Sequence, residues 1–140
     1  MKTLVLAILL LASCGPMPGP IVCRTFCGMQ LEEPPEPQAN TMPWTCDELQ
    51  SLESEVMRVF EASVLDPRFT SSCEAVSGYR VSVQPGVSWV QVGSGTRVSG
   101  ETYCVNKVVL VNNVSPMVSS LPHEMAHAIQ NCSPIWDPGD

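Results

Sequence analysis

The residues most able to carry chemistry in this 140-residue chain lie in one short segment, His123-Glu124-Met125-Ala126-His127. The chain has only two histidines, and both belong to this segment, four positions apart. On an α-helix, residues i and i+4 project from the same face, so the two imidazoles can bind one metal ion. Zinc accepts such nitrogen ligands and in catalytic sites keeps one position open for water. The spacing therefore predicts a zinc site held by His123 and His127.

Glu124 supplies the second part of this chemistry. It lies about 100° around the predicted helix from His123, which places its carboxylate beside the metal rather than on it. In such a site the metal lowers the pKa of its water and polarises a carbonyl group, while the carboxylate takes up a proton and later returns it. We therefore expect Glu124 to act as the general base.

The segment resembles the zinc-binding helix of the zincin metallopeptidases. The match is specific over about ten residues, from Leu121 and Pro122 through the motif to Ala128 and Ile129, and only architectural over the rest of the domain. The resemblance implies zinc as cofactor, hydrolysis of peptide bonds, and a peptide or protein as substrate.

The sequence departs from the zincin pattern at the third zinc ligand. Zincins add a His, Glu or Asp downstream, but Gln130 and Ser133 stand where a metzincin-like extension would have Gly and His or Asp. Only 13 residues follow His127, so we expect Asp137 to be the ligand, with Asp140 as the next candidate. Two alternatives remain open: a site with two protein ligands and water, or a chain that lacks a C-terminal part.

The first fourteen residues indicate export. Lys2 precedes a short apolar run over residues 3–11, which is about half the length of a membrane-spanning helix. The following Leu11-Ala12-Ser13-Cys14 resembles the lipobox of bacterial lipoproteins. This implies a signal peptide over residues 1–13 and a lipid-modified Cys14 that anchors the protein to a membrane of the bacterial cell envelope. The alternative is an ordinary cleavage site with Cys14 incidental.

The cysteine count agrees with export. Seven cysteines are present, and subtracting Cys14 leaves an even set of six at positions 23, 27, 46, 73, 104 and 132. Such a set is typical of an exported protein with three disulfides, and its 15 possible pairings stay open. The even number also favours a disulfide at Cys132 over a role as a thiolate ligand of the metal.

Residues 14–44 are rich in proline and are expected to form a spacer. They hold seven of the thirteen prolines, and residues 31–37 are also acidic, which favours an extended, solvated chain. Residues 21–27 differ because they are apolar and contain two cysteines. We expect them to form a small disulfide-pinned patch docked on the domain, with a metal or redox role as the alternative.

Residues 45–140 are expected to form a minimal zincin-like α+β domain, with an N-terminal helix, a small mixed or antiparallel sheet and a C-terminal helix that carries the motif. The first helix begins at a capping box, Thr45 to Glu48, and ends before Asp66. Period-two alternation predicts a strand at 79–83, and turn residues set off short strands at 87–92, 96–98 and 101–104, the last two paired as a hairpin around Ser99-Gly100. The continuous apolar run at 107–111 predicts a strand covered on both faces.

The last helix is expected over residues 116–131 and contains Pro122 directly before the motif. Proline fits there only in the first turn, with Ser119 or Ser120 as cap, or at a kink of a longer helix.

The charge balance excludes one broad class of partner. With 14 acidic and 7 basic residues the chain carries −7, which argues against general nucleic-acid binding. The leading hypothesis is a lipid-anchored zinc metallopeptidase of the cell envelope. The rival hypothesis is a non-catalytic envelope lipoprotein whose degenerate or truncated zincin-like domain acts by binding.

Overall fold

The structure is a computed structural model that describes residues 19–60 and 65–132. Its helices are α1 (Cys46–Phe60), α2 (Ser72–Val76), the 3-10 turn η1 (Pro116–Val118) and α3 (Leu121–Ile129). Its strands are β1 (Ile21–Arg24), β2 (Gln30–Glu32), β3 (Arg80–Gln84), β4 (Trp89–Val90), β5 (Arg97–Val98), β6 (Gly100–Tyr103) and β7 (Val108–Asn112).

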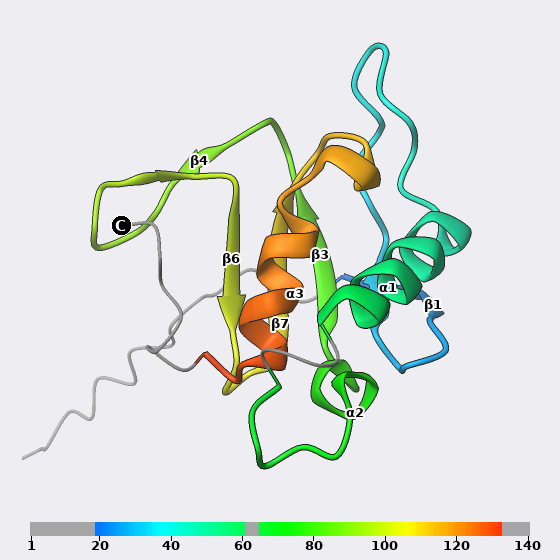
Figure 1. The fold of residues 1–140 in the computed structure, drawn as a ribbon. Coiled ribbons are helices and arrows are strands. Elements are labelled where there is room, and N and C mark those ends of the chain that lie inside the picture. The colour runs from blue at the N-terminus through cyan, green and yellow to red at the C-terminus, as the bar shows by residue number, and fades with distance from the viewer. Residues whose placement is uncertain (1–18, 61–64, 133–140) are drawn as a thin grey trace, which may run out of the picture.

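The described strands form a five-stranded mixed sheet and a separate two-stranded hairpin. The order in the sheet is β1-β2-β3-β7-β6, and β4 pairs with β5 in the hairpin. The three central strands are parallel, whereas β1 and β6 run antiparallel to their neighbours at the two edges. Helices α1 and α2 lie between β2 and β3 in the chain, which provides the crossover that a parallel pair requires (Figure 1). The expected α+β class with a mixed sheet is confirmed.

The core lies between the sheet and the helices. Alternate side chains of β3 and β7 point to this layer, and they are buried together with apolar side chains of α1 and α3. The main members are Val81, Val83, Val109, Val111, Leu49, Leu52, Val56, Leu121, Met125 and Ile129. Burying each such side chain contributes about 1.5–3 kcal/mol, so this layer fixes how α3 sits on the sheet.

The first helix follows its sequence pattern. The Thr45 hydroxyl accepts a hydrogen bond from the Glu48 backbone N–H (3.2 Å), as expected for the N-cap. Leu49, Leu52 and Val56, spaced three and four residues apart, are buried. One turn later Phe60 packs against the core, whereas Val59 is exposed.

The N-terminal boundary of the folded domain was predicted wrongly. Residues 30–32 belong to the sheet rather than to a spacer, because β2 pairs with β1 on one side and with β3 on the other. Leu31 and Met29 are buried in the core, which supplies the apolar contacts that a solvated spacer would lack. The expected disulfide patch at residues 21–27 is confirmed, since it contains β1 and two disulfide-bonded cysteines.

Three further elements differ from expectation. Residues 97–98 pair with β4 across the 93–95 turn, whereas β6 pairs with β7, so the predicted 96–98/101–104 hairpin is wrong. The last helix is shorter than predicted, because residues 116–118 form a separate 3-10 turn before α3. The short helix α2 was not predicted. It begins at Ser71, whose hydroxyl accepts a hydrogen bond from the Glu74 backbone N–H.

The six cysteines of the described residues form three disulfides: Cys23–Cys46, Cys27–Cys73 and Cys104–Cys132. The predicted even set is confirmed, and three disulfides are typical of an exported protein. Within residues 19–60 and 65–132, no helix is long and apolar enough to cross a membrane.

Candidate metal-binding and catalytic site

Helix α3 begins in a way that accommodates the proline before the motif. Pro122 lies at the second helical position, where its missing N–H removes no intrahelical hydrogen bond. Ser120 occupies the N-cap position, but the hydroxyl that accepts from the Leu121 backbone N–H is that of Ser119 (3.2 Å). The Ser120 hydroxyl instead donates to the Ser99 carbonyl oxygen (2.6 Å) next to β6. The first-turn interpretation of Pro122 is therefore confirmed.

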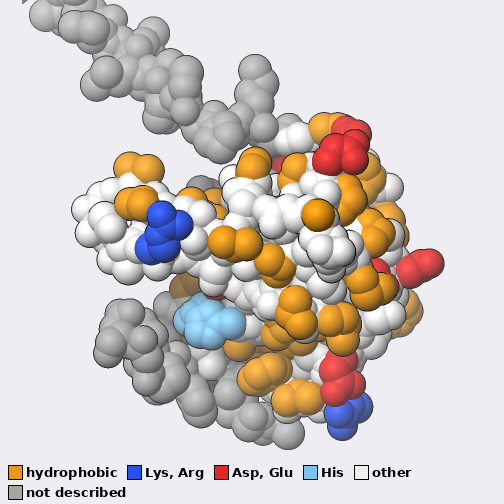
Figure 2. Space-filling model, turned by 90° about the horizontal axis from the view of Figure 1, so that it is seen from above, with side chains coloured by type: hydrophobic (Ala, Val, Ile, Leu, Met, Phe, Trp, Pro, Cys, Tyr) orange, Lys and Arg blue, Asp and Glu red, His pale blue; other side chains and the backbone are white. Residues whose placement is uncertain are grey.

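The two histidines point to the same place on the surface of α3. Their Nε2 atoms are 2.9 Å apart, and their rings meet edge to face with centroids 4.6 Å apart. His123 is exposed and His127 is half-buried. Figure 2 shows the histidine side chains at the surface, beside a hollow that separates them from the projecting lobe of the β4–β5 hairpin.

This arrangement fits a shared metal ion. In a tetrahedral zinc site with Zn–N bonds of about 2.0–2.1 Å, two ligand nitrogens are about 3.3 Å apart. The Nε2 atoms of His123 and His127 need to separate by only a few tenths of an ångström, roughly, to reach that distance. Without metal, one imidazole can donate to the other, because a neutral ring has one donor and one acceptor nitrogen.

The proposed third ligands lie outside the described residues. Asp137 and Asp140 belong to the segment 133–140, so their placement beside the histidines stays a prediction. Within the described part of the chain, no group of three His, Cys, Asp or Glu side chains is placed to hold a metal ion. Cys132 is bonded to Cys104, which confirms its predicted disulfide role.

Glu124 lies between α3 and the edge strand β6. Its carboxylate is buried, at 5% exposure, and accepts a hydrogen bond from the Thr102 hydroxyl (2.6 Å). Burial raises the pKa of Glu124 above its ordinary value. The Thr102 hydrogen bond and the charges of the two histidines lower that pKa, and the Glu101 charge raises it. Burial is the largest of these effects, which is the direction expected for a carboxylate that has to accept a proton.

Strand β6 presents different chemistry on its two faces. Gly100 and Thr102 face α3 and contact Glu124. Glu101 accepts hydrogen bonds from the Trp89 indole (3.0 Å) and from the Tyr103 hydroxyl. The bond to Glu101 raises the pKa of Tyr103 to about 12, so this phenol stays protonated at neutral pH. These contacts attach the β4–β5 hairpin to the strand that contacts Glu124.

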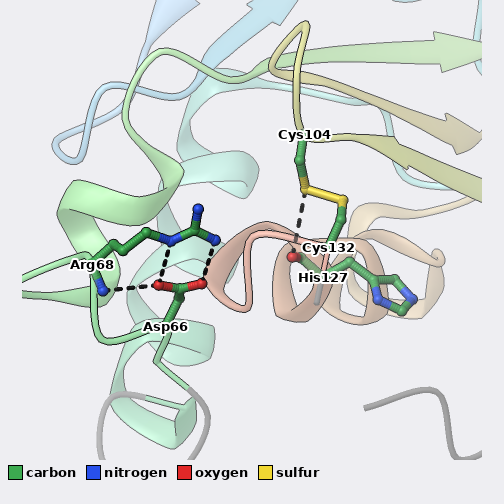
Figure 3. Close-up of polar contacts among 5 residues, drawn as sticks. All are labelled: Asp66, Arg68, Cys104, His127 and Cys132. Carbon is green, nitrogen blue, oxygen red and sulfur yellow. Dashed lines mark hydrogen bonds and ion pairs between the residues drawn. A yellow bond between two sulfur atoms is a disulfide. The ribbon is translucent and has the colours of Figure 1, made fainter. Parts of the chain in front are cut away.

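The C-terminal end of α3 is held by several contacts. The backbone turns sharply at Asn131 and Cys132, both with positive φ, and the Cys132 N–H donates to the His127 carbonyl oxygen (2.9 Å). The same carbonyl lies 3.8 Å from Cys104 Sγ in the disulfide that joins β6 to the end of α3 (Figure 3). The Asp66 backbone N–H donates to the Ile129 carbonyl oxygen (3.1 Å), so the loop before α2 also caps this end.

The sequence motif located His123, Glu124 and His127 but gave no sign of the residues on β6 that contact Glu124. Gly100 and Thr102 lie in a segment that the alternation predicts to be a turn and a strand. Only the pairing of β6 with β7 decides which of its faces meets α3. The lipidation candidate Cys14 lies outside the described residues.

The chain shows no significant match to any protein-family model, curated protein or solved structure.

Proposed function

We propose that the protein is an exported zinc-dependent peptidase whose site is carried by α3 and β6. The observation that supports this most is the convergence of the His123 and His127 Nε2 atoms beside the buried Glu124. Two imidazoles and a carboxylate of raised pKa form the donor set and the base that metal-assisted hydrolysis requires.

Each residue has a distinct role in this proposal. His123 and His127 hold the zinc ion, and Asp137 is the proposed third ligand. When bound, zinc acts as a Lewis acid that polarises the scissile carbonyl and makes water more acidic. Glu124 removes a proton from the attacking water and delivers it to the leaving amine, which restores the carboxylate for the next cycle.

The location follows from the sequence and from the disulfides. Three disulfides support export, and the lipobox-like residues before Cys14 support a lipid anchor in the bacterial cell envelope. A Cys14→Ser variant of the full chain should move from the membrane fraction to the soluble fraction. Unchanged fractionation would refute the lipid anchor.

Zinc binding is the first test. The full chain, purified from an oxidising compartment, should bind close to one zinc ion per molecule by atomic absorption. The His127→Ala variant should lose most of this zinc. The control variant Gln91→Ala, which removes a polar side chain from the β4–β5 hairpin, should retain it. A wild-type protein without near-stoichiometric zinc would refute both the ligands and the enzyme.

Peptide cleavage is the second test. Glu124→Gln keeps the shape of the side chain but removes the base, so cleavage of a peptide library should fall by about 10²–10⁴-fold. Glu55→Gln removes a carboxylate that pairs with Arg58 on the exposed side of α1 and should leave cleavage unchanged. Zinc binding without any cleavage by the wild type would favour the non-catalytic alternative, a lipoprotein that acts by binding.

A further inference from the structure

The Glu124 carboxylate has one hydrogen-bond donor among the described residues, and that donor comes from a different element. The Thr102 hydroxyl on β6 lies 2.6 Å from Glu124 Oε2 and 3.0 Å from the Glu124 backbone carbonyl oxygen. A hydroxyl carries one proton and two lone pairs, so it can donate to either oxygen and accept as well.

The other carboxylate oxygen depends on the absence of a side chain. A Cβ added at Gly100 would collide with Glu124 Oε1 and with the Ser120 hydroxyl. Gly100 and Thr102 are two residues apart on β6 and face α3 together. Gly100 therefore leaves the space that Glu124 Oε1 occupies, and the Thr102 hydroxyl binds Glu124 Oε2.

The strand that supplies both residues is fixed against α3 beyond these contacts. The disulfide Cys104–Cys132 joins the residue after β6 to the end of α3, and Ser120 donates to the Ser99 carbonyl before β6. Both ends of β6 are thus attached to α3, so the distance between Thr102 and Glu124 is held by the fold rather than by one hydrogen bond.

We propose that Thr102 is a positioning residue that holds the Glu124 carboxylate for proton transfer, with Gly100 providing the space this orientation needs. The proposal rests on the proposed peptidase function for its effect on turnover, but the side-chain orientation it assigns is independent of metal and of activity. Partners that orient a catalytic group commonly change activity by 10–100-fold, roughly, when they are removed.

The test compares Thr102→Val, which keeps the shape and removes the hydroxyl, with Thr102→Ser, which keeps the hydroxyl. The control is Thr41→Val, which removes a hydroxyl bonded to the Gln38 carbonyl in a loop far from α3 in the chain. Thr102→Val should lower kcat by about 30-fold with KM within about twofold, whereas Thr102→Ser should stay within about threefold of wild type. Thr41→Val should behave as wild type, and all variants should bind zinc equally.

A second measurement is made on the metal-free protein. The NMR cross-relaxation between the β-proton of residue 102 and the γ-protons of Glu124 should be strong in wild type and Thr102→Ser, and lost in Thr102→Val. A wild-type kcat together with a retained signal in Thr102→Val would overturn the inference and leave the peptidase function intact. If the wild type cleaves no peptide, the proposed function fails, and the NMR signal of the metal-free protein alone tests the positioning role. A signal retained in Thr102→Val would then overturn the inference.

The Gly100→Ala variant provides a second test of the inference if Thr102→Val does not fold. The added methyl group should displace the carboxylate, weaken the signal and lower kcat while leaving zinc binding unchanged. Wild-type values for both the signal and kcat in this variant would overturn the inference.

Discussion

Two glutamates of this protein lie on helices and are almost fully buried, yet their surroundings differ. Glu53 on α1 is 1% exposed, and its carboxylate accepts hydrogen bonds from the Thr25 hydroxyl and the Cys27 backbone N–H (3.0 Å). The Gln50 side chain donates a third (3.2 Å). Glu124 on α3 is 5% exposed and receives a hydrogen bond from Thr102. Both carboxylates join a helix to the strand or loop that it covers.

The number of donors separates a structural carboxylate from one that can react. The three donors give the buried oxygens of Glu53 hydrogen-bond partners in place of water, which is what a polar group in the core needs. Among the described residues the Glu124 carboxylate has one donor, and burial raises its pKa, which is the direction expected for a group that accepts a proton. The region around Glu53 is therefore expected to govern stability, and the region around Glu124 to govern chemistry.

Removing a disulfide is expected to have the largest effect on stability, and it tests whether the regions around Glu53 and Glu124 have different roles. Replacing both Cys104 and Cys132 by serine opens a loop of sequence separation 28, and replacing Cys23 and Cys46 opens one of 23. Loop entropy gives each a similar cost of about 3.5 kcal/mol. Only the first pair attaches β6 to α3, so only its loss should reduce zinc affinity and cleavage. Urea unfolding and zinc titration measure the two quantities. Equal damage to zinc binding by both pairs would contradict the distinction between the regions.

Removing Glu53 should affect stability and spare the site. Glu53→Ala leaves the Thr25 hydroxyl and the Cys27 N–H buried without their acceptor, which should lower the free energy of unfolding by about 3 kcal/mol. Zinc stoichiometry of the remaining folded protein should equal that of wild type. A loss below about 1 kcal/mol would show that the three donors do not stabilise the fold.

Removing the charge of Glu124 should leave the stability of the fold intact, in contrast to the removal of Glu53. Because burial raises its pKa, the ionised carboxylate is less favourable in the folded than in the unfolded protein. The protonated Glu124 side chain makes its full contribution to the free energy of unfolding at a pH below its pKa in the unfolded chain. This contribution is lost as the pH rises through its pKa in the folded protein. Glu124→Gln should therefore keep or increase stability at pH 7 in metal-free protein, by about 1 kcal/mol or less. Urea midpoints at pH 4 and 7 measure this, and a marked loss at pH 7 would make Glu124 a second structural carboxylate.

The sequence predicted those parts of the fold that depend on local pattern. The helix over 46–60 follows from its cap and apolar spacing, and the motif segment from its histidine spacing. The six-cysteine set was predicted from an even count, but its pairing was not, because pairing depends on which distant segments meet.

The parts that failed depend on long-range contacts. The sequence pattern places β2 in the spacer because acidic residues and prolines follow it, whereas β2 is held in the sheet by pairing with β3 and by burial of Leu31. Likewise β5 was paired with β6 because a Ser-Gly turn lies between them. In the structure, the unbroken apolar run of β7 pairs with β6 instead. The same dependence hid Thr102, since its role requires knowledge of which face of β6 meets α3.

The loop that caps α3 should make the site region sensitive to acid. The Arg68 guanidinium and backbone N–H bind the Asp66 carboxylate (2.7–2.9 Å) and lower its pKa to about 2 (Figure 3). A carboxylate with a lowered pKa contributes stability above its unfolded pKa, near 3.8, and this contribution is lost as the pH falls through about 2. The backbone N–H of Asp66 binds the last turn of α3, so fraying should begin at that end.

Amide hydrogen exchange at pH 5 and 2.5 tests this expectation. When the pH falls from 5 to 2.5, the amides in the last turn of wild-type α3 should lose protection from exchange. The amides of α1 should stay protected, because the hydrogen bond from Asp66 is made to α3. Asp66→Asn should already be less protected in α3 at pH 5 and should change little on acidification, because the titrating group is gone. Glu33→Gln, an exposed carboxylate before the 34–37 loop, should follow wild type. Equal loss of protection in α1 and α3 would mean that acid acts on the whole fold, and the two regions would then not differ in how they respond to pH.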